Sequence, residues 1–349
     1  LVPWGFSPRQ SIRLPTGRER EKMSWACQPV YSVVPKSEEM TDTGMAHIRF
    51  SHRPDCSLVV VNNGPERDGF DVCSKCGAAL PHSATEAEKR EILSPYLDNI
   101  TKRPPKCSHD WQEVVLGSPF KSDMLLIELG ISMREVSTPQ NGGNSWFLRA
   151  STSLAEAVRL SAVDILDVDF SELNVGCNRI YGRDNAKCDI YLFDSLSSGA
   201  GYSAMLSSEK SVRTVLERAR ELLDGCDCEA SCGSCLQHFQ NKRLHGVLDR
   251  KAGLELLDYA VRGTIAAPIE EEEARRCFEP LMAAVKRAFP DSGFEFDGPT
   301  LSIRIGGAVK TIEIVPDMWQ ATHGQVRKFE VTHAVPDLFE RIVFSTKGK

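Results

Sequence analysis

Four cysteines within a stretch of ten residues constrain this chain more than any other feature of its sequence. They are Cys226, Cys228, Cys232 and Cys235. Four sulfur ligands at this spacing can converge on one ion, because Ser231 and Gly233 are small enough for the backbone to fold tightly around it. Coordination by four thiolates is typical of structural zinc, in which no position is left open for a substrate. We therefore predict a zinc site that organises the surrounding surface and does not itself catalyse a reaction.

Other chemistries of clustered cysteines fit the sequence less well. A disulfide framework is typical of short secreted chains, whereas this chain has 349 residues, 12 unevenly distributed cysteines and no signal-peptide pattern. Iron–sulfur clusters also bind four cysteines, but their usual spacings differ from the CxC-x3-CxxC pattern found here. Zinc is the preferred interpretation, and an iron–sulfur cluster, a disulfide or free thiols are the alternatives.

A second group of potential ligands lies earlier in the chain. Cys73 and Cys76 form a CxxCG knuckle, in which Gly77 permits the left-handed turn that lets both sulfurs face one ion. Cys107 and His109 are predicted to complete the site, because the cost of closing a longer loop grows only logarithmically with its length. The prediction is a second zinc site with three sulfur ligands and one nitrogen ligand.

The ligands of this second site are less constrained than the choice of metal. His82 competes with His109 for the fourth position, and Cys56 is a further candidate. The alternative is a set of unliganded thiols in a loop-rich region.

The composition bounds the remaining possibilities. A hydrophobic content of 41% and a charged content of 26% are ordinary for a soluble globular chain, and 349 residues suffice for roughly two or three domains. No segment approaches the about 18 consecutive apolar residues of a membrane span, so we expect a cytoplasmic protein without a membrane partner. The formal charge of −6 means that contact with nucleic acid has to come from a local basic patch.

No catalytic constellation is recognisable in the sequence. It has no GxxxxGK(S/T) phosphate loop, no nucleophile elbow and no HExxH motif. Asp297 and Glu313 are similar to the acidic pair of a nuclease core, but Val315 stands where the lysine of such a core is expected. We therefore assign no catalytic residue to this chain.

The best local basic patch directly follows the four cysteines. Its predicted DNA contacts are Asn241, Lys242, Arg243, His245 and Arg250. Cations and amide donors on a rigid element suit phosphate contacts, and a zinc-anchored loop provides that rigidity. The alternative is a solvated surface in which Asp249 and Arg250 form ion pairs at the start of a helix.

The hydrophobic pattern from residue 111 onward predicts an α/β fold. Strands are expected over 112–116, 124–129, 145–149 and 188–194, and helices over 153–166, 203–224 and 249–261. Ser153 and Glu156 indicate a capping box at the first of these helices. The glycine-containing turn at 197–202 can cradle a phosphate at a helix N-terminus, or it can simply connect strand and helix.

The predicted architecture is a mixed sheet packed by helices, with the four-cysteine loop between two of the helices. A small C-terminal α+β element follows. It consists of a helix over 270–288 and strands at 294–296, 300–305 and 309–315 that alternate apolar and polar residues.

Residues 110–262 resemble the MrfA-like zinc-binding domain, a module at the C-terminal end of a group of superfamily 2 DEAD/DEAH-type DNA helicases. The resemblance rests on the helix start at 153–157, the strand and turn at 191–202, the four cysteines and the stretch at 241–250. It implies a zinc site formed by these cysteines, in an accessory module that helps a helicase motor hold or route DNA during repair. The resemblance also implies a link to phage defence, where related chains occur as helicase partners.

Two departures from the family pattern bear on function. The turn reads Ser197-Ser-Gly199 where the family usually has Pro-Gly-Gly, and the chain has no motor motifs. A motor is therefore expected in cis, upstream in the same polypeptide, or in trans on a separate subunit. The alternative function is a stand-alone protein-interaction subunit, in which the zinc site shapes a docking surface for a helicase or another partner.

The predicted organisation has four parts. An irregular segment over 1–65 belongs to an upstream domain, and a zinc-knuckle insertion covers 66–110. The MrfA-like zinc-binding domain covers 111–262, and the C-terminal helix with its antiparallel hairpins covers 263–349.

Overall fold

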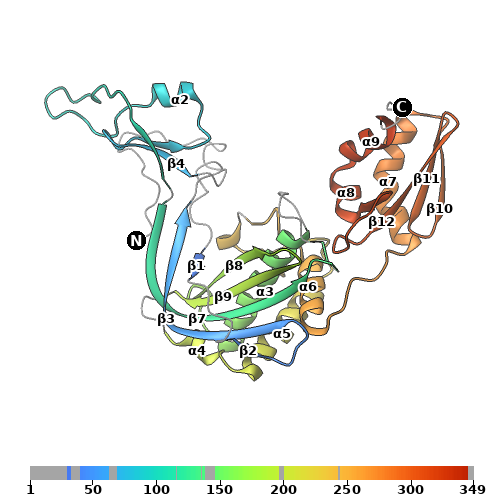
Figure 1. Ribbon diagram of the computed structural model, residues 1–349, viewed down its shortest axis with the longest axis horizontal. Coiled ribbons are helices and arrows are strands. Elements are labelled where there is room, and N and C mark those ends of the chain that lie inside the picture. The colour runs from blue at the N-terminus through green and yellow to red at the C-terminus, as the bar shows by residue number, and fades with distance from the viewer. Residues whose placement is uncertain are drawn as a thin grey trace.

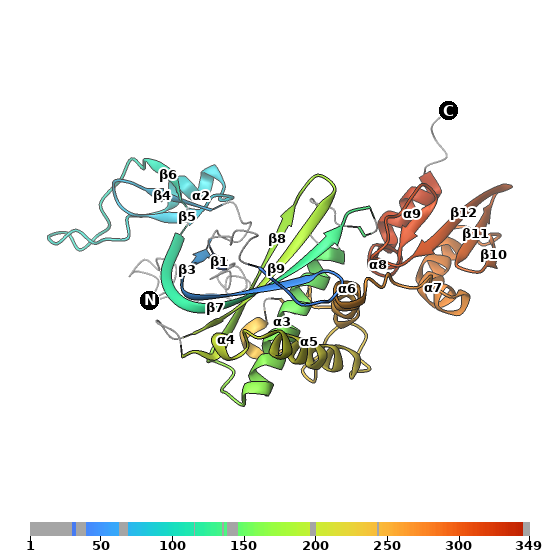
Figure 2. The ribbon, with the colours of Figure 1, turned by 60° about the horizontal axis from the view of Figure 1, so that its bottom comes forward.

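The computed structural model describes a chain in three parts (Figure 1). A central six-stranded sheet carries helices on one face, a knuckle module lies at the end of two long strands, and an α+β element follows at the C-terminus. In both ribbon views the module and the C-terminal element lie on opposite sides of the central body (Figure 2). The described residues are 30–32, 40–62, 69–114, 116–134, 136–137, 146–195, 200–242 and 244–344.

The central sheet has the strand order β1–β3–β7–β9–β8, with β2 paired to the start of β3. Its strands are β1 (Val30–Ser32), β2 (Thr41–Asp42), β3 (Ile48–Asn62), β7 (Leu116–Ser132), β8 (Leu173–Tyr181) and β9 (Asn185–Asp194). All pairings that the described residues make in this sheet are antiparallel. The face toward the helices is apolar, with Ile127, Ile190 and Leu192 fully buried in the main core.

The helices α3 (Trp146–Leu166), α5 (Glu209–Asp224) and α6 (Arg250–Arg262) cover this face. α3 packs against both other long helices and against β8, so nearly its whole N-terminal length is buried. α6 approaches α3 closely at Gly253, where a Cβ atom would lie 3.1 Å from the Cβ of Ser153. The fold class is thereby confirmed as α/β, with the cysteine loop between the two helices α5 and α6.

The predicted start of α3 is wrong. Residues 146–149, expected in a strand, form the first turn of the helix, because the aromatic side chains there are buried against the core. Ser153 therefore lies inside α3, where its hydroxyl accepts the N–H of Asp249 at 2.7 Å. Glu156 is buried and lies 3.1 Å from His238 Nε2 instead of closing a capping box. These two side chains join α3 to the segment after the cysteines.

The helix predicted over 203–224 is divided into α4 (Tyr202–Met205) and α5. Ser208 begins α5 as its N-cap by accepting the N–H of Ser211 at 3.1 Å, and this polar cap interrupts the apolar pattern. The helix expected over 249–261 is confirmed within a residue, with Asp249 as the N-cap of α6. Among the described helices, none combines the length and apolar character that crossing a membrane requires.

An irregular segment was expected over 1–65, but its described residues include a long regular strand, β3. β3 pairs with β7 along both strands, from Ile48 opposite Leu129 to Asn62 opposite Leu116. Its register shifts between Arg53 and Cys56, and the polar residues at this bulge conceal the strand in the sequence. Residues 1–29 lie outside the described part, and β3 belongs to the central sheet.

The knuckle module, defined here as residues 69–114, is inserted between β3 and β7. It contains β4 (Phe70–Cys73), β5 (Ala79–Pro81), α2 (Glu86–Glu91) and β6 (Trp111–Val114), with the strand order β5–β4–β6. The module thus extends beyond residue 110, because β6 pairs with β4. The carboxylate of Asp71 is buried between Lys89 Nζ at 2.8 Å and His82 Nδ1 at 3.0 Å. This ion group fastens α2 to the small sheet.

The C-terminal element contains α7 (Glu271–Ala288), β10 (Gly293–Asp297), β11 (Thr300–Ile305) and β12 (Ala308–Val315), which confirms the expected helix and strands. β13 (Gln325–Arg327), α8 (Lys328–His333) and α9 (Val335–Phe344) were not expected. β13 lies parallel to β12, so this small sheet contains both parallel and antiparallel pairs, whereas the described pairs of the central sheet are all antiparallel. Its core is separate from that of the central sheet.

Candidate metal centres and the surface beside them

The four cysteines of the loop between α5 and α6, called here the cysteine loop (226–235), gather at one point. All four Sγ atoms lie within 4.8 Å of one another. The Sγ atoms of Cys226 and Cys232 are 3.6 Å apart, and those of Cys228 and Cys235 are 3.7 Å apart. Zinc–sulfur bonds of about 2.3 Å in a tetrahedron place the sulfurs about 3.8 Å apart. The cysteine loop therefore fits a four-sulfur zinc site.

Arg250, the first residue of α6, supports the cysteine loop by donating hydrogen bonds to main-chain carbonyl groups. Arg250 donates from Nε to the carbonyl of Cys228 at 2.7 Å and from Nη1 to the carbonyl of Leu223 at 3.1 Å. Its main-chain N–H donates to the carbonyl of Ala230 at 2.7 Å. Arg250 is buried, so one guanidinium joins the end of α5, the cysteine loop and the start of α6.

The knuckle group, Cys73, Cys76, Cys107 and His109, also gathers its ligand atoms within 4.8 Å of one another. The Sγ atoms of Cys73 and Cys107 are 3.8 Å apart, and His109 Nδ1 lies 3.4 Å from the Sγ of Cys76. The structure thus brings together the four residues that spacing suggested, from the β4–β5 turn and from the segment before β6. Three sulfurs and one imidazole nitrogen suit zinc.

The orientation of His109 supports its place in the knuckle group. Its other ring nitrogen, Nε2, lies 3.0 Å from the carbonyl of Ile92, and this contact leaves Nδ1 to face the sulfurs. The competing His82 instead contacts Asp71. Cys56 lies on β3 and is not among the residues that gather here.

Local hydrogen bonds favour the thiolate form at one cysteine of each group. The main-chain hydrogen bond at Ser234 lowers the pKa of Cys232 to about 7. Burial opposes deprotonation of Cys73, but main-chain hydrogen bonds from Asp110 and Cys76 lower its pKa to about 6. Both thiols therefore deprotonate near neutral pH, which suits thiolate coordination.

The residues predicted to contact DNA differ in their exposure to solvent. Asn241 is buried, donates to the carbonyl of Leu236 at 2.8 Å and lies 3.0 Å from His245 Nε2. Arg250 is buried as described above, so both side chains brace the loop from inside. Lys242 is exposed, and Arg243 lies outside the described residues.

Sequence analysis missed an exposed aromatic side chain beside Lys242. Phe239 begins a short 3-10 turn (Phe239–Asn241), and 83% of its surface is exposed. The ammonium group of Lys242 lies 5.1 Å from the centre of this ring. An aromatic residue in a polar stretch, between His238 and Gln240, was the available signal.

In the turn before α4, the amide groups of residues 200–203 are all engaged by one carboxylate. One carboxylate oxygen of Asp194 accepts the N–H groups of Ala200, Gly201 and Tyr202, at 2.7, 2.6 and 3.1 Å. Its other oxygen accepts the N–H of Ser203 at 2.9 Å. These four donors are therefore occupied by the chain itself and do not bind a phosphate. Residues 196–199 of this turn lie outside the described part.

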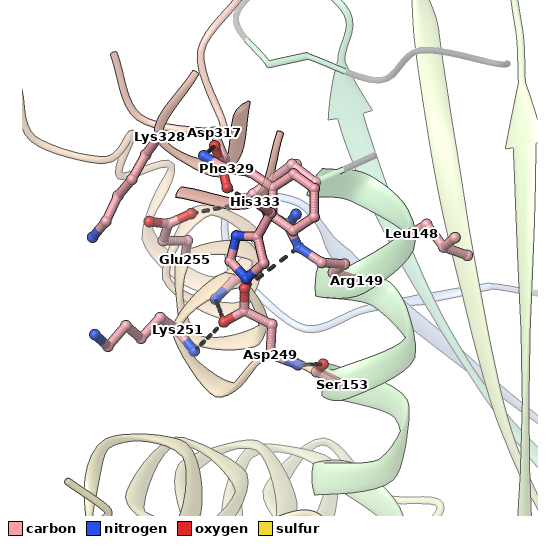
Figure 3. A network of polar contacts seen from close by, with 12 residues as sticks. Leu148, Arg149, Ser153, Asp249, Lys251, Glu255, Asp317, Lys328, Phe329 and His333 are labelled. Carbon is pink, nitrogen blue, oxygen red and sulfur yellow. Dashed lines mark hydrogen bonds and ion pairs between the residues drawn. The ribbon is translucent and has the colours of Figure 1, made fainter. Parts of the chain in front are cut away.

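A buried ion network joins the C-terminal element to α3 and α6 (Figure 3). The guanidinium of Arg149 on α3 contacts the carboxylates of Asp249 and Asp317 and lies 3.9 Å from the centre of the Phe329 ring. Asp317 also accepts the N–H of Phe329 at 2.7 Å. Glu255 on α6 faces this network (Figure 3). The contacts of Arg149 hold the C-terminal element beside α6, the helix that supports the cysteine loop.

Comparison with known proteins identifies the domain that holds the cysteine loop. Residues 154–236 match the family model of the MrfA Zn-binding domain. This match confirms, for these residues, the resemblance to the MrfA-like zinc-binding domain found in the sequence.

The chain is 31% identical over 311 residues to the Druantia protein DruE of Escherichia coli (strain UMEA 4076-1). This match covers 85% of the chain but 16% of DruE, so the chain spans about a sixth of its relative's length.

Two crystal structures of the DUF1998 helicase MrfA also align with this chain. The structure bound to DNA aligns with 67% of this chain and 25% of the MrfA chain, at 13% identity and a TM-score of 0.38. The structure bound to DNA and AMPPNP covers 67% of this chain and 22% of the MrfA chain, at 12% identity and a TM-score of 0.26.

Proposed function

We propose that this chain is a zinc-stabilised accessory module of a superfamily 2 DEAD/DEAH-type DNA helicase. In this role it helps the motor hold or route DNA in repair or phage defence, in the cytoplasm. The observation that carries the proposal is the family match at 154–236, together with four convergent cysteines in that region. The similarity to a Druantia protein supports the link to defence.

Zinc has a structural role in this proposal. Four sulfurs in the cysteine loop leave no position for a water molecule or a substrate, so the site shapes the connection between α5 and α6. ATP hydrolysis comes from a motor in cis or in trans, because the sequence has no phosphate loop.

The proposed DNA contact lies in the segment after the cysteine loop, where the side chains of Phe239 and Lys242 are exposed. Lys242, Arg243 and His245 supply positive charge or hydrogen-bond donors to phosphates, and Phe239 offers an exposed ring on which a base can stack. Asn241 keeps this segment in shape from the buried side. A local contact of this kind is compatible with a net charge of −6.

The test is the affinity of the 349-residue chain for labelled single-stranded and duplex DNA, measured by fluorescence anisotropy over a range of salt concentrations. Replacing Lys242 and Arg243 together by Ala should weaken binding to all sequences and reduce the slope of log K against log salt by roughly 1 to 2. Phe239→Ala should weaken single-strand binding by about fivefold or more. Lys210→Ala, an exposed lysine on α5, is the matched control.

Two outcomes would contradict this proposal. Wild-type protein that binds no DNA would rule out DNA handling by this chain. Binding that is unchanged in the Lys242/Arg243 variant would rule out this surface. Salt-independent capture of a helicase subunit without DNA would instead favour the protein-interaction alternative.

A further inference from the structure

The knuckle module presents an unusual concentration of exposed apolar side chains. Its tip loop, defined as residues 93–106, follows α2 and carries Leu93, Tyr96, Leu97 and Ile100 at its surface. Tyr96 is 67% exposed and Ile100 is 90% exposed. These four are a large share of the exposed large hydrophobic residues in the described part of the chain, and they lie within eight consecutive positions.

The same loop carries a run of cations. Lys102, Arg103 and Lys106 are exposed, and none of the three makes an ion pair with a described residue. Pro104 and Pro105 lie between them and restrict the backbone, so the three charges are held along a stiff stretch. The tip loop therefore combines an exposed aromatic ring and apolar side chains with cations that pair with no residue in the described part of the chain.

The one acidic side chain within the tip loop is already engaged by its own backbone. Asp98 accepts the N–H groups of Ile100 and Thr101, at 3.0 and 2.6 Å, and the hydroxyl of Thr101 at 2.9 Å. These bonds lower the pKa of Asp98 and keep its carboxylate in the turn. The turn thus has a fixed shape.

The knuckle group supports the aromatic side chain of this loop. The ring of Tyr96 lies against Gly77, where an added Cβ would be 3.7 Å from the ring carbon Cε2. His109 is anchored to Ile92, directly before the tip loop, through its Nε2 contact. The metal ligands and the exposed ring therefore belong to one small structure, which holds Tyr96 in place.

The tip loop belongs to the knuckle module, whereas Phe239 and Lys242 lie in the segment between α5 and α6. Figures 1 and 2 both show the module at the end of the β3–β7 ribbon, away from the helical face of the central sheet. A ligand of the tip loop would therefore be a second contact, separate from the one proposed beside the cysteine loop.

We propose that the tip loop binds single-stranded DNA, with a base stacked on Tyr96 and phosphates contacted by Lys102, Arg103 and Lys106. The inference rests on the proposed function, that this chain handles DNA. An exposed aromatic ring, in the same loop as exposed cations that pair with no described residue, is the combination by which proteins bind single strands without sequence preference. Paired bases in a duplex present no free face to such a ring, so the contact favours unpaired DNA.

The experiment uses the 349-residue chain and an oligothymidine strand, with binding measured by anisotropy. Tyr96→Ala should weaken single-strand binding by about fivefold or more, whereas Tyr96→Phe should retain it. Both variants should leave duplex binding unchanged. Met205→Ala, which removes another exposed apolar side chain, is the control for non-specific effects.

A second variant tests the same contact without altering a residue that packs beside the knuckle group. Replacing Lys102, Arg103 and Lys106 by Gln changes only exposed side chains, and it should reduce the single-strand salt slope by roughly 2. Zinc content equal to that of the wild type confirms the fold of each variant.

The outcomes separate this inference from the proposed function. Loss of single-strand affinity in the Tyr96 and tip-cation variants, with duplex binding intact, supports it. Unchanged affinity in both variants overturns it and leaves the tip loop to a protein partner, while the Lys242 contact stands. A wild-type chain that binds no DNA overturns both.

Discussion

The guanidinium of Arg250 donates to the main-chain carbonyl of Cys228 at 2.7 Å, from a position buried between two helices. This contact makes Arg250 part of the support of the cysteine loop. Arg250→Gln should lower the free energy of unfolding by about 1 to 3 kcal/mol, because buried carbonyls lose their donor. It should also speed the transfer of zinc to a chelator. Urea denaturation measures the loss of stability, and a chromogenic chelator measures the rate of zinc transfer.

Arg262→Gln, at the exposed end of the same helix, is the matched control for this charge change. Arg262 itself is exposed, so loss of its ion pair with Asp258 should change the stability by no more than about 0.5 kcal/mol. Equal effects of the two substitutions would argue against a supporting role for Arg250.

Metal content should follow the two groups of ligands independently. We expect two zinc ions per chain by elemental analysis, and one after either Cys228→Ser or Cys107→Ser, because each substitution breaks one closed set of four ligands. Cys56→Ser is the control and should retain both ions. A single zinc in the wild type would contradict the knuckle site, and iron would contradict the assignment of the metal.

Glu255 should make stability depend on pH. Burial, assisted by the nearby carboxylates of Asp317 and Asp249, raises the pKa of Glu255 from 4.5 to about 7, although the indole N–H of Trp146 donates to it. The folded chain then binds more protons than the unfolded chain between these values. The free energy of unfolding should therefore fall as pH rises from about 4.5 to about 7, and this contribution should be constant above that.

Glu255→Gln should remove this dependence while still accepting the hydrogen bond from Trp146. Relative to the wild type, the variant should gain roughly 2 kcal/mol between about pH 5 and pH 8. Urea denaturation at both pH values measures the difference. A difference between the two proteins that does not change with pH would sink this assignment.

Tyr191 leaves no room for a side chain at Gly176, which is its cross-strand partner in β8 and β9. A Cβ atom at Gly176 would lie 2.2 Å from Cε2 of the ring. Gly176→Ala should therefore destabilise the fold by about 1 to 3 kcal/mol, because the buried ring must move. Thermal unfolding measures the loss.

Gly130→Ala is the matched substitution within the same sheet. Its Cβ would meet the carbonyl of His47 at 3.9 Å, an ordinary contact distance. If both alanine variants unfold at the same temperature, the ring of Tyr191 does not restrict position 176.

Features that depend on neighbouring residues could be predicted from the sequence. The four cysteines are local, so their convergence followed from spacing, and the helices expected over 203–224 and 249–261 end and begin close to where α5 ends and α6 begins. The knuckle group was harder, because its two halves are separated by a long loop. Several residues in that region carry a suitable ligand atom, and only the fold chooses His109 over His82.

Features that depend on distant partners could not be predicted. β3 is recognisable only through its pairing with β7, because a bulge and polar residues hide its alternation. Trp146 and Phe147 have strand-like propensity, but burial against the core places them in a helix. The basic character of Arg250 suggested a contact with DNA, since charge alone does not reveal that a side chain is buried.

The insertion of the knuckle module between two paired strands bears on the order in which the chain folds. During synthesis the ligands from Cys73 to His109 emerge before β7, while β3 still lacks its longest pairing partner. Closing the module around a metal shortens the free loop that separates β3 from β7, and a shorter loop costs less entropy to close. A chain made in the presence of zinc should therefore assemble its central sheet faster than one made without it. In that case metal supply influences the rate of folding as well as the stability of the finished protein.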